Sequence, residues 1–317
     1  MEPPTPKPRP RSASPAIPDR RKITPPANQL PNLMSSPSSL LRLVSAFLLF
    51  TTAGLQAAES KPFKVLTYNV LYGFNYQKST ALGAEWIKGQ QADVVALQEM
   101  TKFTQDKLSA LAKKWGHQHA VILKEKGFPV CLTSMTPIEV LEKRVEDMWH
   151  GYLHCKVRGV HIFVIHLSPS RHDVRVREAG ILFAKIQPLL SAKEKVILMG
   201  DFNCNSPLDK SWLEGRKSTE EWRKKLPANA DPGYVTMSKF LALGLIDLVH
   251  TKQPQPQVQL GTFPTTVKEQ SRSGNNWRID FILTDPFFAK TCTSAHTLRD
   301  KVVHKISDHF PVQASFR

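Results

Sequence analysis

The 317-residue sequence is poor in cysteine, in long apolar runs and in acidic residues, and each shortage excludes a class of protein. Its four cysteines are too few for a small scaffold held together by disulfides. No apolar run reaches the roughly 18 residues of a membrane-spanning helix. No cluster of histidine and cysteine is present, which argues against a zinc site. Hydrophobic residues still make up 41% of the chain, which is enough for a sizeable core and excludes a wholly disordered protein.

The shortage of acidic residues leaves the chain strongly basic, with 43 Lys or Arg against 27 Asp or Glu and a formal charge of +16. Residues 1–58 hold seven basic and two acidic residues, so that five of these charges belong to that segment and about eleven remain on residues 59–317. Because Lys and Arg neutralise phosphates and attract polyanions, the charge favours a nucleic acid or an anionic lipid surface as partner.

The first 58 residues read as segments that precede a folded domain. Residues 1–38 hold 11 of the 24 prolines and few apolar residues, so they bury too little surface to fold. Residues 39–58 contain one arginine, a short apolar run and then small residues, which is the pattern of a secretory signal. Because a signal stands at an amino terminus, we expect translation to start at Met34; an uncleaved membrane anchor is the alternative. The sequence predicts a secreted or periplasmic protein.

Beyond residue 61, short β-branched runs alternate with helical patterns, which predicts one α/β domain over residues 59–317. Leu108, Leu111 and Ala112 recur at helical spacing, and a second helix is expected around Ala179 and Leu182. Residues 207–232 are polar and charged and are expected to form a surface insertion. Buried strands are expected at residues 63–70, 93–99, 160–167, 195–202 and 278–284.

Polar side chains stand where several of these strands end. A buried strand that ends abruptly in a carboxylate, an amide or an imidazole places that group at an edge of the sheet, and several such ends on one side make a site. Each residue alone has an ordinary explanation, such as a turn, a helix cap or a buried histidine; their joint occurrence favours function. They are Asn69, Glu99, His166, Asp201, Asn203, Asp280, Asp308 and His309.

The order of these motifs resembles the endonuclease/exonuclease/phosphatase family, which includes deoxyribonuclease I, AP endonucleases, bacterial sphingomyelinases and inositol polyphosphate phosphatases. The resemblance covers residues 61–317. It implies an α/β (α+β) fold: a four-layer α/β/β/α sandwich of two mixed β-sheets packed face to face, with flanking helices. The motifs are TYNV (67–70), LQE (97–99), IHL (165–167), GDFN (200–203), RID (278–280) and SDH (307–309).

The resemblance also implies a divalent metal and a set of roles. Cleavage of a phosphate ester attacks an anionic group, so the site needs positive charge and an activated water. Glu99 would be the principal metal ligand, supported by Asn69 and with Asp308 near the ion. Such oxygen ligands suit Mg²⁺ or Mn²⁺. His309 would contact the phosphate or act as general base, held by Asp280.

The remaining motif residues would act on the water and the phosphate. Asp201 and Asn203 would position the nucleophilic water and donate to a non-bridging oxygen. His166 would be a phosphate ligand or general acid, as in deoxyribonuclease I and the sphingomyelinases, with Glu125 as the candidate partner. AP endonucleases have a Tyr-containing motif at this point and an acidic residue where this chain has Leu71, so these positions point away from them.

Three further residues are expected to support the site. Arg175 and Glu178 are expected to form a structural salt bridge or to support the phosphate side, and Arg278 to orient Asp280. The four cysteines leave both free thiols and disulfides open.

The leading hypothesis is an exported metal-dependent phosphodiesterase, most specifically a nuclease, that acts as a monomer without a stable protein partner. A secreted lipid phosphodiesterase of sphingomyelinase type is the alternative. It would need an exposed aromatic hairpin, for which residues 286–288 are the only candidate. A phosphate-binding interaction module is the third interpretation, disfavoured because every motif residue is present.

Overall fold

The computed structural model describes residues 62–214, 233–253, 261–267 and 277–317. The chain divides into residues 1–59 and a unit of residues 60–317, and only the second contains described residues. The predicted leader and signal segment, residues 1–38 and 39–58, therefore lie outside the described residues, as does most of the predicted insertion at 207–232. Within the described ranges, no helix has the length and apolar character needed to cross a membrane.

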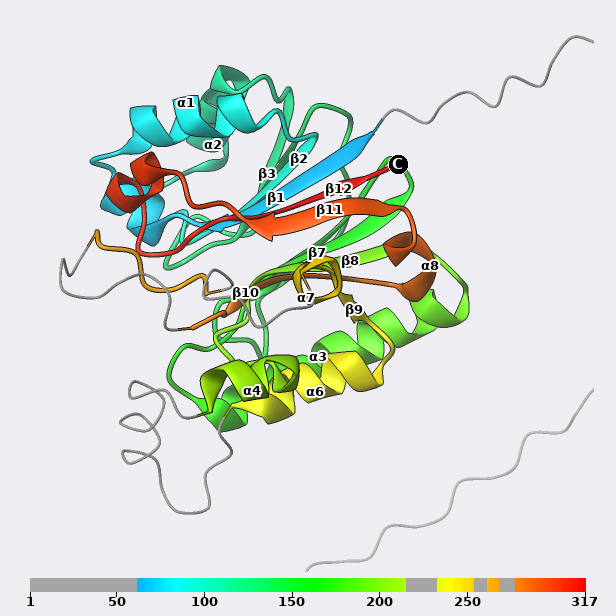
Figure 1. Ribbon diagram of the computed structural model, residues 1–317. Helices are drawn as coiled ribbons and strands as arrows, with labels where there is room; N and C mark the ends of the chain where they lie inside the picture. Colours follow the sequence, from blue (N-terminus) through cyan, green and yellow to red (C-terminus); the bar gives the residue numbers. More distant parts are fainter. Residues whose placement is uncertain (1–61, 215–232, 254–260, 268–276) are drawn as a thin grey trace, which may run out of the picture. The chain divides into compact units, whose positions relative to one another are not determined.

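In the described residues, twelve strands form two six-stranded sheets (Figure 1). The first has the order β11 (Cys292–Thr297), β12 (Val312–Phe316), β1 (Phe63–Asn69), β2 (Val94–Gln98), β4 (Cys131–Ser134) and β3 (His119–Ile122). The second has the order β5 (Glu139–Arg144), β6 (Tyr152–Val157), β7 (Val160–His166), β8 (Val196–Asp201), β10 (Asp280–Thr284) and β9 (Ile246–Asp247).

Each sheet is mixed because it contains one parallel pair among antiparallel neighbours. Parallel neighbours need a crossover, and helices supply it. Helix α1 (Thr80–Gln90) lies between β1 and β2 in the chain, and α3 (His172–Ser191) lies between β7 and β8. The carboxyl ends of a parallel pair meet at one edge, so these two pairs determine where the polar strand ends gather.

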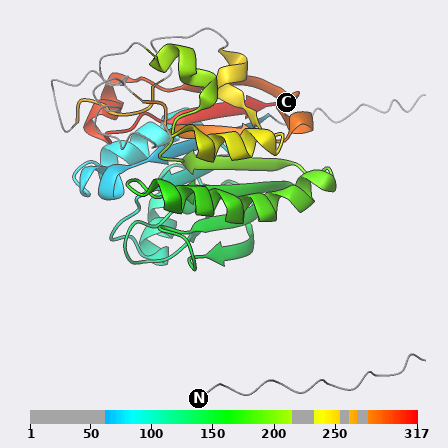
Figure 2. The same ribbon diagram turned by 90° about the horizontal axis from the view of Figure 1, so that it is seen from below.

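Helices cover the outer face of each sheet (Figures 1 and 2). Helices α1 and α2 (Gln105–Lys114) lie over the first sheet, and α3 and α6 (Tyr234–Ala242) lie side by side over the second. One apolar cluster fills the space between the sheets, where Val65 and Ala96 meet Val164 and Met199. Two further clusters lie under the helices. The predicted four-layer sandwich is confirmed.

The five predicted strands and two predicted helices are all present, with ends within two residues for the strands. Leu108, Leu111 and Ala112 face the core from α2, and Ala179 and Leu182 from α3. The predicted strands are buried along almost their whole length. Strand β5 was missed because its sequence, EVLEKR, is exposed and charged at a sheet edge.

All four cysteines are buried free thiols, so no disulfide is formed.

Short elements complete the described chain. The short elements are η1 (Leu71–Asn75), η2 (Pro207–Asp209), α4 (Lys210–Leu213), α7 (Leu248–Lys252), α8 (Pro286–Ala289) and η3 (Lys301–Lys305).

Candidate active site

A cleft of about 390 Å³ opens where the polar strand ends meet. All eight residues predicted from the motifs belong to it: six line the cleft, and Asn69 and Asp280 lie directly behind, each 1% exposed. The lining residues are Tyr72, Glu99, Phe128, Trp149, His150, His166, Pro169, Asp201, Asn203, Phe263, Asp308 and His309.

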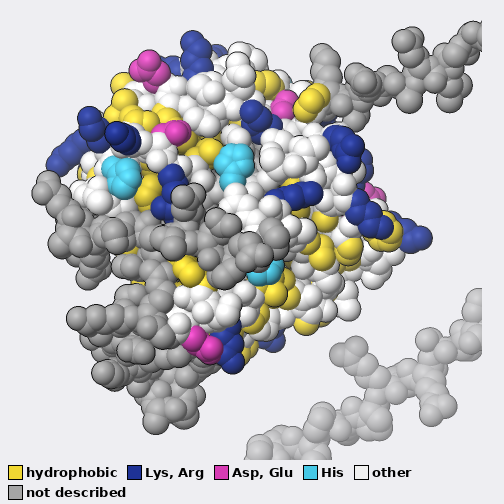
Figure 3. All heavy atoms as spheres, viewed as in Figure 1, with side chains coloured by type: hydrophobic (Ala, Val, Ile, Leu, Met, Phe, Trp, Pro, Cys, Tyr) yellow, Lys and Arg dark blue, Asp and Glu magenta, His cyan; other side chains and the backbone are white. Residues whose placement is uncertain are grey.

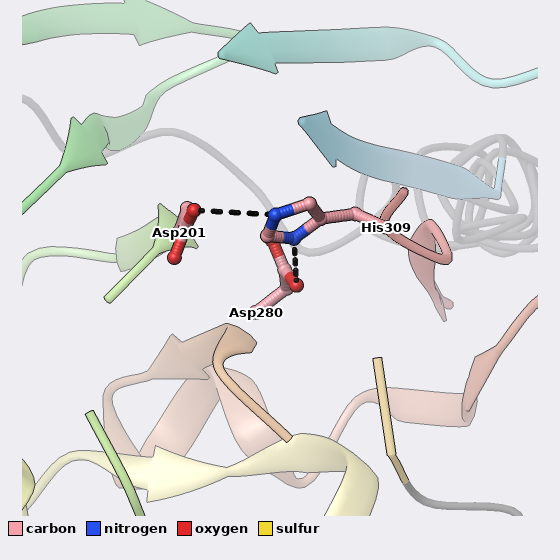
Figure 4. A group of neighbouring side chains, drawn as sticks. All are labelled: Asp201, Asp280 and His309. Carbon is pink, nitrogen blue, oxygen red and sulfur yellow. Dashed lines mark hydrogen bonds and ion pairs between the residues drawn. The ribbon is translucent and has the colours of Figure 1, made fainter. Parts of the chain in front are cut away.

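Two aspartates hold His309 between them (Figure 4). Asp201 ends β8 and Asp280 begins the antiparallel strand β10, directly opposite it in the register. His309 Nδ1 lies 2.9 Å from Asp280 Oδ2, and its Nε2 lies 3.8 Å from Asp201 Oδ2. The hydrogen bond to Asp280 leaves Nε2 turned toward Asp201, as predicted for a carboxylate that orients an imidazole.

The pKa values of His309 and Asp201 are both raised above their ordinary values. Burial lowers the pKa of His309, but the negative charges of Asp280, Asp201 and Asp308 outweigh it and raise the pKa to about 10. Burial and the neighbouring Asp280 raise the pKa of Asp201 to about 7. At neutral pH the imidazole is therefore a cation, and Asp201 is poised to exchange a proton.

Asn69 connects the two sheets at the site. Its amide nitrogen donates to Glu99 Oε1 at 3.2 Å and to Asp201 Oδ2 at 3.0 Å, across the interface between β1 and β8. Its amide oxygen accepts the backbone N–H of Leu71 at 3.1 Å. In this orientation Asn69 fixes both carboxylates, and ligation of a metal by its oxygen stays a prediction.

Glu99 lies on a strained piece of backbone. Its φ is +59°, a left-handed conformation that is uncommon outside glycine and is often found at functional sites. Its Oε2 accepts the backbone N–H of Tyr72 at 3.0 Å. The carboxylate is thus aimed by a backbone donor on one oxygen and by Asn69 on the other.

The donor set of the cleft fits a divalent cation. Glu99 and Asp308 offer carboxylate oxygens to the same cleft, which suits Mg²⁺ or Mn²⁺. Asp201, Asp280 and His309 also place potential ligand atoms within 4.8 Å of one another. Because Nδ1 of His309 is hydrogen-bonded to Asp280, only its Nε2 could bind a metal in this second group of residues. A hard cation prefers oxygen ligands, so the carboxylates of Glu99 and Asp308 are the favoured metal site.

Asn203 supports Asp201. Its backbone, with φ at +47°, turns so that the N–H donates to Asp201 Oδ1 at 2.9 Å. Its amide nitrogen donates to the carbonyl of Leu167 at 3.0 Å, which leaves one N–H of that amide for a substrate oxygen. The predicted donation to phosphate would use this second hydrogen.

His166 pairs with a histidine rather than with the expected glutamate. Its ring stacks on His150 at 4.2 Å between centroids, and its Nε2 lies 3.5 Å from Asp201 Oδ2. Burial lowers the pKa of His166 well below its usual value, and interactions with His150, His309 and Lys124 lower it further, so the ring is neutral. A neutral imidazole is a hydrogen-bonding ligand for phosphate and a poor general acid.

The interpretation of Glu125 as partner of His166 is wrong. Glu125 Oε1 accepts the backbone N–H of Gln105 at 2.9 Å, at the first turn of α2. A carboxylate there satisfies a free helix N–H and interacts well with the helix dipole. His150 was missed because it precedes β6 rather than ending a strand, and the local sequence carries no signal for it.

Arg175 and Glu178 support the segment that follows His166. Glu178 accepts the backbone N–H of Trp149 at 2.7 Å and that of Ser168 at 2.9 Å, while Arg175 donates to the carbonyl of Ser168 at 2.7 Å. Helix α3 therefore fixes the backbone on two sides of the cleft. A salt bridge between the two side chains, or a role of either in supporting the phosphate, stays a prediction.

The expectation that Arg278 orients Asp280 is wrong. Its guanidinium forms two hydrogen bonds of 2.8 Å with Asp209 and an ion pair of 2.7 Å with Asp247, and it lies over the ring of Phe281. Burial lowers the pKa of Arg278, but the two carboxylates outweigh this and raise it. The side chain thus connects η2, which carries Asp209, to β9, which carries Asp247. The backbone N–H of Asp280 donates instead to Oγ1 of Thr262, at 3.1 Å.

Comparison with known proteins places these features in a family and a fold. The model of the Endonuclease/Exonuclease/phosphatase family matches residues 66–309. No curated protein sequence matches the chain. Solved structures that are similar include an AP endonuclease from Archaeoglobus fulgidus, with a TM-score of 0.64 and 22% identity. A 3′ phosphatase from Neisseria bound to product DNA hairpin has a TM-score of 0.62 and 20% identity. A 3′-5′ exonuclease from Neisseria meningitidis has a TM-score of 0.57 and 20% identity. Each likeness covers 80% of this chain and 99% of the other.

Proposed function

Since the chain belongs to the endonuclease/exonuclease/phosphatase family and is a hydrolase of phosphate esters, we propose that it is a divalent-metal-dependent nuclease that cleaves phosphodiester bonds with an activated water. The observation that carries this proposal is the joining of two groups of polar residues in one cleft. Asn69 hydrogen-bonds both Glu99 and Asp201. The carboxylate of Glu99, which suits a cation, and that of Asp201, which lies beside His309, are thereby held by the same amide.

The chain's own groups support a hydrolytic step. Asp201 accepts a proton from a water as the water oxygen bonds to phosphorus. The bond from phosphorus to the leaving oxygen breaks, and solvent protonates that oxygen. His309, kept cationic by Asp280, stabilises the charge on the non-bridging oxygens. A divalent ion held by Glu99 and Asp308, when bound, supplies further positive charge to the phosphate.

A nucleic acid is favoured over a membrane lipid as substrate. The lipid alternative needs an exposed aromatic hairpin, but Phe288 packs against Phe316 at 4.3 Å between ring centroids and only Phe287 is exposed, at 61%. Helix α8, which carries both, follows the end of β10 opposite to Asp280. The aromatic pair thus offers no insertion loop beside the cleft.

We further propose that the domain is exported. The apolar and small-residue pattern at residues 39–58 is the support for this proposal. Mass spectrometry of the native amino terminus tests it. A mature terminus near residue 59 is expected, and a retained peptide from residues 39–58 would contradict cleavage.

The test of the nuclease proposal is turnover by the full chain with Mg²⁺, with Mn²⁺ and with a chelator. The substrates are plasmid DNA, RNA, sphingomyelin vesicles and bis(4-nitrophenyl) phosphate. Metal-dependent cleavage of a nucleic acid is expected. Turnover of the lipid alone would support the sphingomyelinase alternative, and turnover of none would support a phosphate-binding module.

Asp201→Asn is the decisive variant in this assay. It keeps the shape of the side chain but removes the group that accepts the proton, so we expect kcat to fall by a factor of about 10² to 10⁴. Asp173→Asn is the matched control, because Asp173 is an exposed carboxylate on α3 that pairs only with Arg171 in the described contacts. Equal activity of the two variants would exclude Asp201 from catalysis.

A further inference from the structure

A series of aromatic rings leads from the protein surface to His166. Tyr76 stacks on Tyr72 with centroids 4.6 Å apart and planes 17° apart, and Tyr72 meets Phe128 edge-on at 5.0 Å. Phe128 contacts His150 at 5.4 Å, and His150 stacks on His166. Trp149 also contacts His150, at 6.4 Å. Tyr72, Tyr76, Phe128, Trp149 and His150 are called the aromatic wall below.

The aromatic wall continues the cleft outward rather than the core. Tyr72, Phe128, Trp149 and His150 line the cleft together with the proposed catalytic groups. Tyr76 and Trp149 are each 47% exposed, and exposed aromatic side chains that gather beside a cleft mark a ligand-binding surface. The exposed ring faces therefore extend from the protein surface toward His166, which is expected to bind phosphate.

Backbone constraints hold the aromatic wall in place before any ligand binds. Residues 71–77 all have positive φ, and this left-handed turn sets Tyr72 and Tyr76 on one face. Left-handed backbone costs about 1–2 kcal/mol per non-glycine residue, so other contacts must maintain it. Phe74, fully buried against Gly83 of α1, is one. Glu178 holds the backbone of Trp149 at 2.7 Å.

The charge of Lys124 next to the aromatic wall favours an anionic ligand, whereas the carboxylates of Glu99 and Asp308 in the same cleft are assigned above to a metal cation. Lys124 is partly buried, and its positive charge acts on both His150 and His166 by lowering their pKa. Among the described residues, no carboxylate forms an ion pair with Lys124. An aromatic cage for a quaternary ammonium group, such as the choline of a lipid, needs the opposite charge. Aromatic faces next to an unpaired cation instead suit a base attached to a phosphate backbone.

We propose that the aromatic wall binds an unstacked nucleobase of a single-stranded segment next to the phosphate to be hydrolysed, with Lys124 facing the backbone of that strand. The inference rests on the proposed nuclease function and names its substrate class. In a duplex the base faces are covered by their neighbours, so they cannot reach the aromatic wall. The protein then prefers single strands, frayed ends and loops to duplex of the same sequence, with little dependence on base identity.

Binding of two chemically matched strands tests the proposal. One is oligothymidylate and the other is a phosphodiester chain of equal length with tetrahydrofuran in place of each nucleoside, so that only the bases differ. Fluorescence anisotropy with a chelator present gives both dissociation constants for the full chain. Trp149→Ala and Tyr76→Ala should each weaken binding of oligothymidylate about five- to hundredfold while changing that of the base-free chain less than twofold. Phe287→Ala, which removes an exposed aromatic at the far end of β10, is the control and should change neither.

Cleavage assays then separate the inference from the function on which it rests. Wild type should cleave a single strand faster than its duplex, and Trp149→Ala should reduce this ratio. Cleavage of nucleic acid with equal affinity for the two strands would overturn the aromatic wall and leave the nuclease proposal intact. Absence of any nucleic-acid cleavage would overturn the nuclease proposal. Binding of sphingomyelin vesicles that is lost in Trp149→Ala, without binding of oligothymidylate, would assign the wall to a lipid.

Discussion

His309 owes its positive charge to the carboxylates that surround it. Burial alone would lower the pKa of the imidazole, and the raised value of about 10 reflects Asp280 first and Asp201 and Asp308 after it. Asp280 makes a direct hydrogen bond of 2.9 Å to Nδ1. One buried aspartate thus sets both the orientation and the charge of the residue that faces Asp201.

Asp280→Asn tests this dependence through pH. The amide keeps an acceptor for Nδ1 but removes the charge, so the pKa of His309 falls and the imidazole loses its proton at a lower pH. If the cation assists turnover, the alkaline decline of kcat/KM begins at lower pH in the variant than in the wild type, measured between about pH 6 and about pH 10. Asp173→Asn should keep the wild-type profile. Superimposable profiles of wild type and Asp280→Asn would show that the charge of His309 is not used.

At the residue scale, the strand-end pattern identified the members of the site but not their contacts. Asp201, Asp280 and His309 were predicted because polar groups interrupt apolar runs, which is visible locally. His150 was missed, and Glu125 and Arg278 were assigned the wrong contacts. Their partners come from other elements, and neither spacing nor composition encodes a contact between rings or charges that are distant along the chain.

At the scale of elements, the left-handed turn at residues 71–77 is the feature that departs most from ordinary local preference. Seven successive residues have positive φ, and only one of them is glycine. Hydrogen bonds within the turn, such as that from Asn75 N–H to the carbonyl of Val70 at 3.1 Å, account for part of its stability. Packing of Phe74 against α1 accounts for another part, because Gly83 leaves room for the ring.

A pair of glycine substitutions in α1 tests that packing. A Cβ at Gly83 would lie 2.6 Å from Cε1 of the buried Phe74 ring, whereas a Cβ at Gly89 meets nothing within 4 Å. We expect Gly83→Ala to lower the free energy of unfolding by roughly 1–3 kcal/mol. Gly89→Ala should leave it unchanged or raise it by about 0.5–1 kcal/mol, since alanine is the better helix former. Chemical denaturation measures both, and equal values would show that Phe74 does not need the space at Gly83.

The strands that sequence patterns predicted are long and buried along almost their whole length. Strands β1, β2, β7, β8 and β10 are continuous apolar runs because they lie inside the sandwich. The edge strand β5 carries charged residues and looks like a loop in sequence. The left-handed turn was not predicted, because only Gly73 and Asn75 among its seven residues are of types that favour positive φ.

At the scale of the whole molecule, the two sheets bring together groups that neither could assemble alone. Glu99 follows β2 of the first sheet and Asp201 ends β8 of the second, and Asn69 joins them. The visible face of the sandwich carries Lys and Arg widely, with fewer acidic patches between them (Figure 3). This distribution agrees with the surplus of about eleven positive charges on residues 59–317.

That surplus predicts a strong effect of salt on the affinity for nucleic acid. Each phosphate that contacts Lys or Arg releases a counterion, so we expect binding of oligothymidylate to weaken roughly tenfold or more between about 50 mM and about 200 mM NaCl. Turnover of bis(4-nitrophenyl) phosphate, which carries a single charge, is the comparison and should change little. An affinity that does not vary with salt would show that the basic surface takes no part in binding.

The sequence by itself indicated an α/β domain and the polar residues of the cleft, which follow from local features: runs of buried strand, the helical spacing of apolar residues, and carboxylates, amides and imidazoles where strands end. The order of the motifs indicated the family by resemblance, and the resemblance implied the four-layer sandwich. Only the tertiary structure decided that Asn69 joins Glu99 to Asp201, that His150 stacks on His166, and that exposed rings extend the cleft. Such contacts join segments far apart in the chain, and their geometry depends on how two sheets pack face to face, which no local pattern specifies.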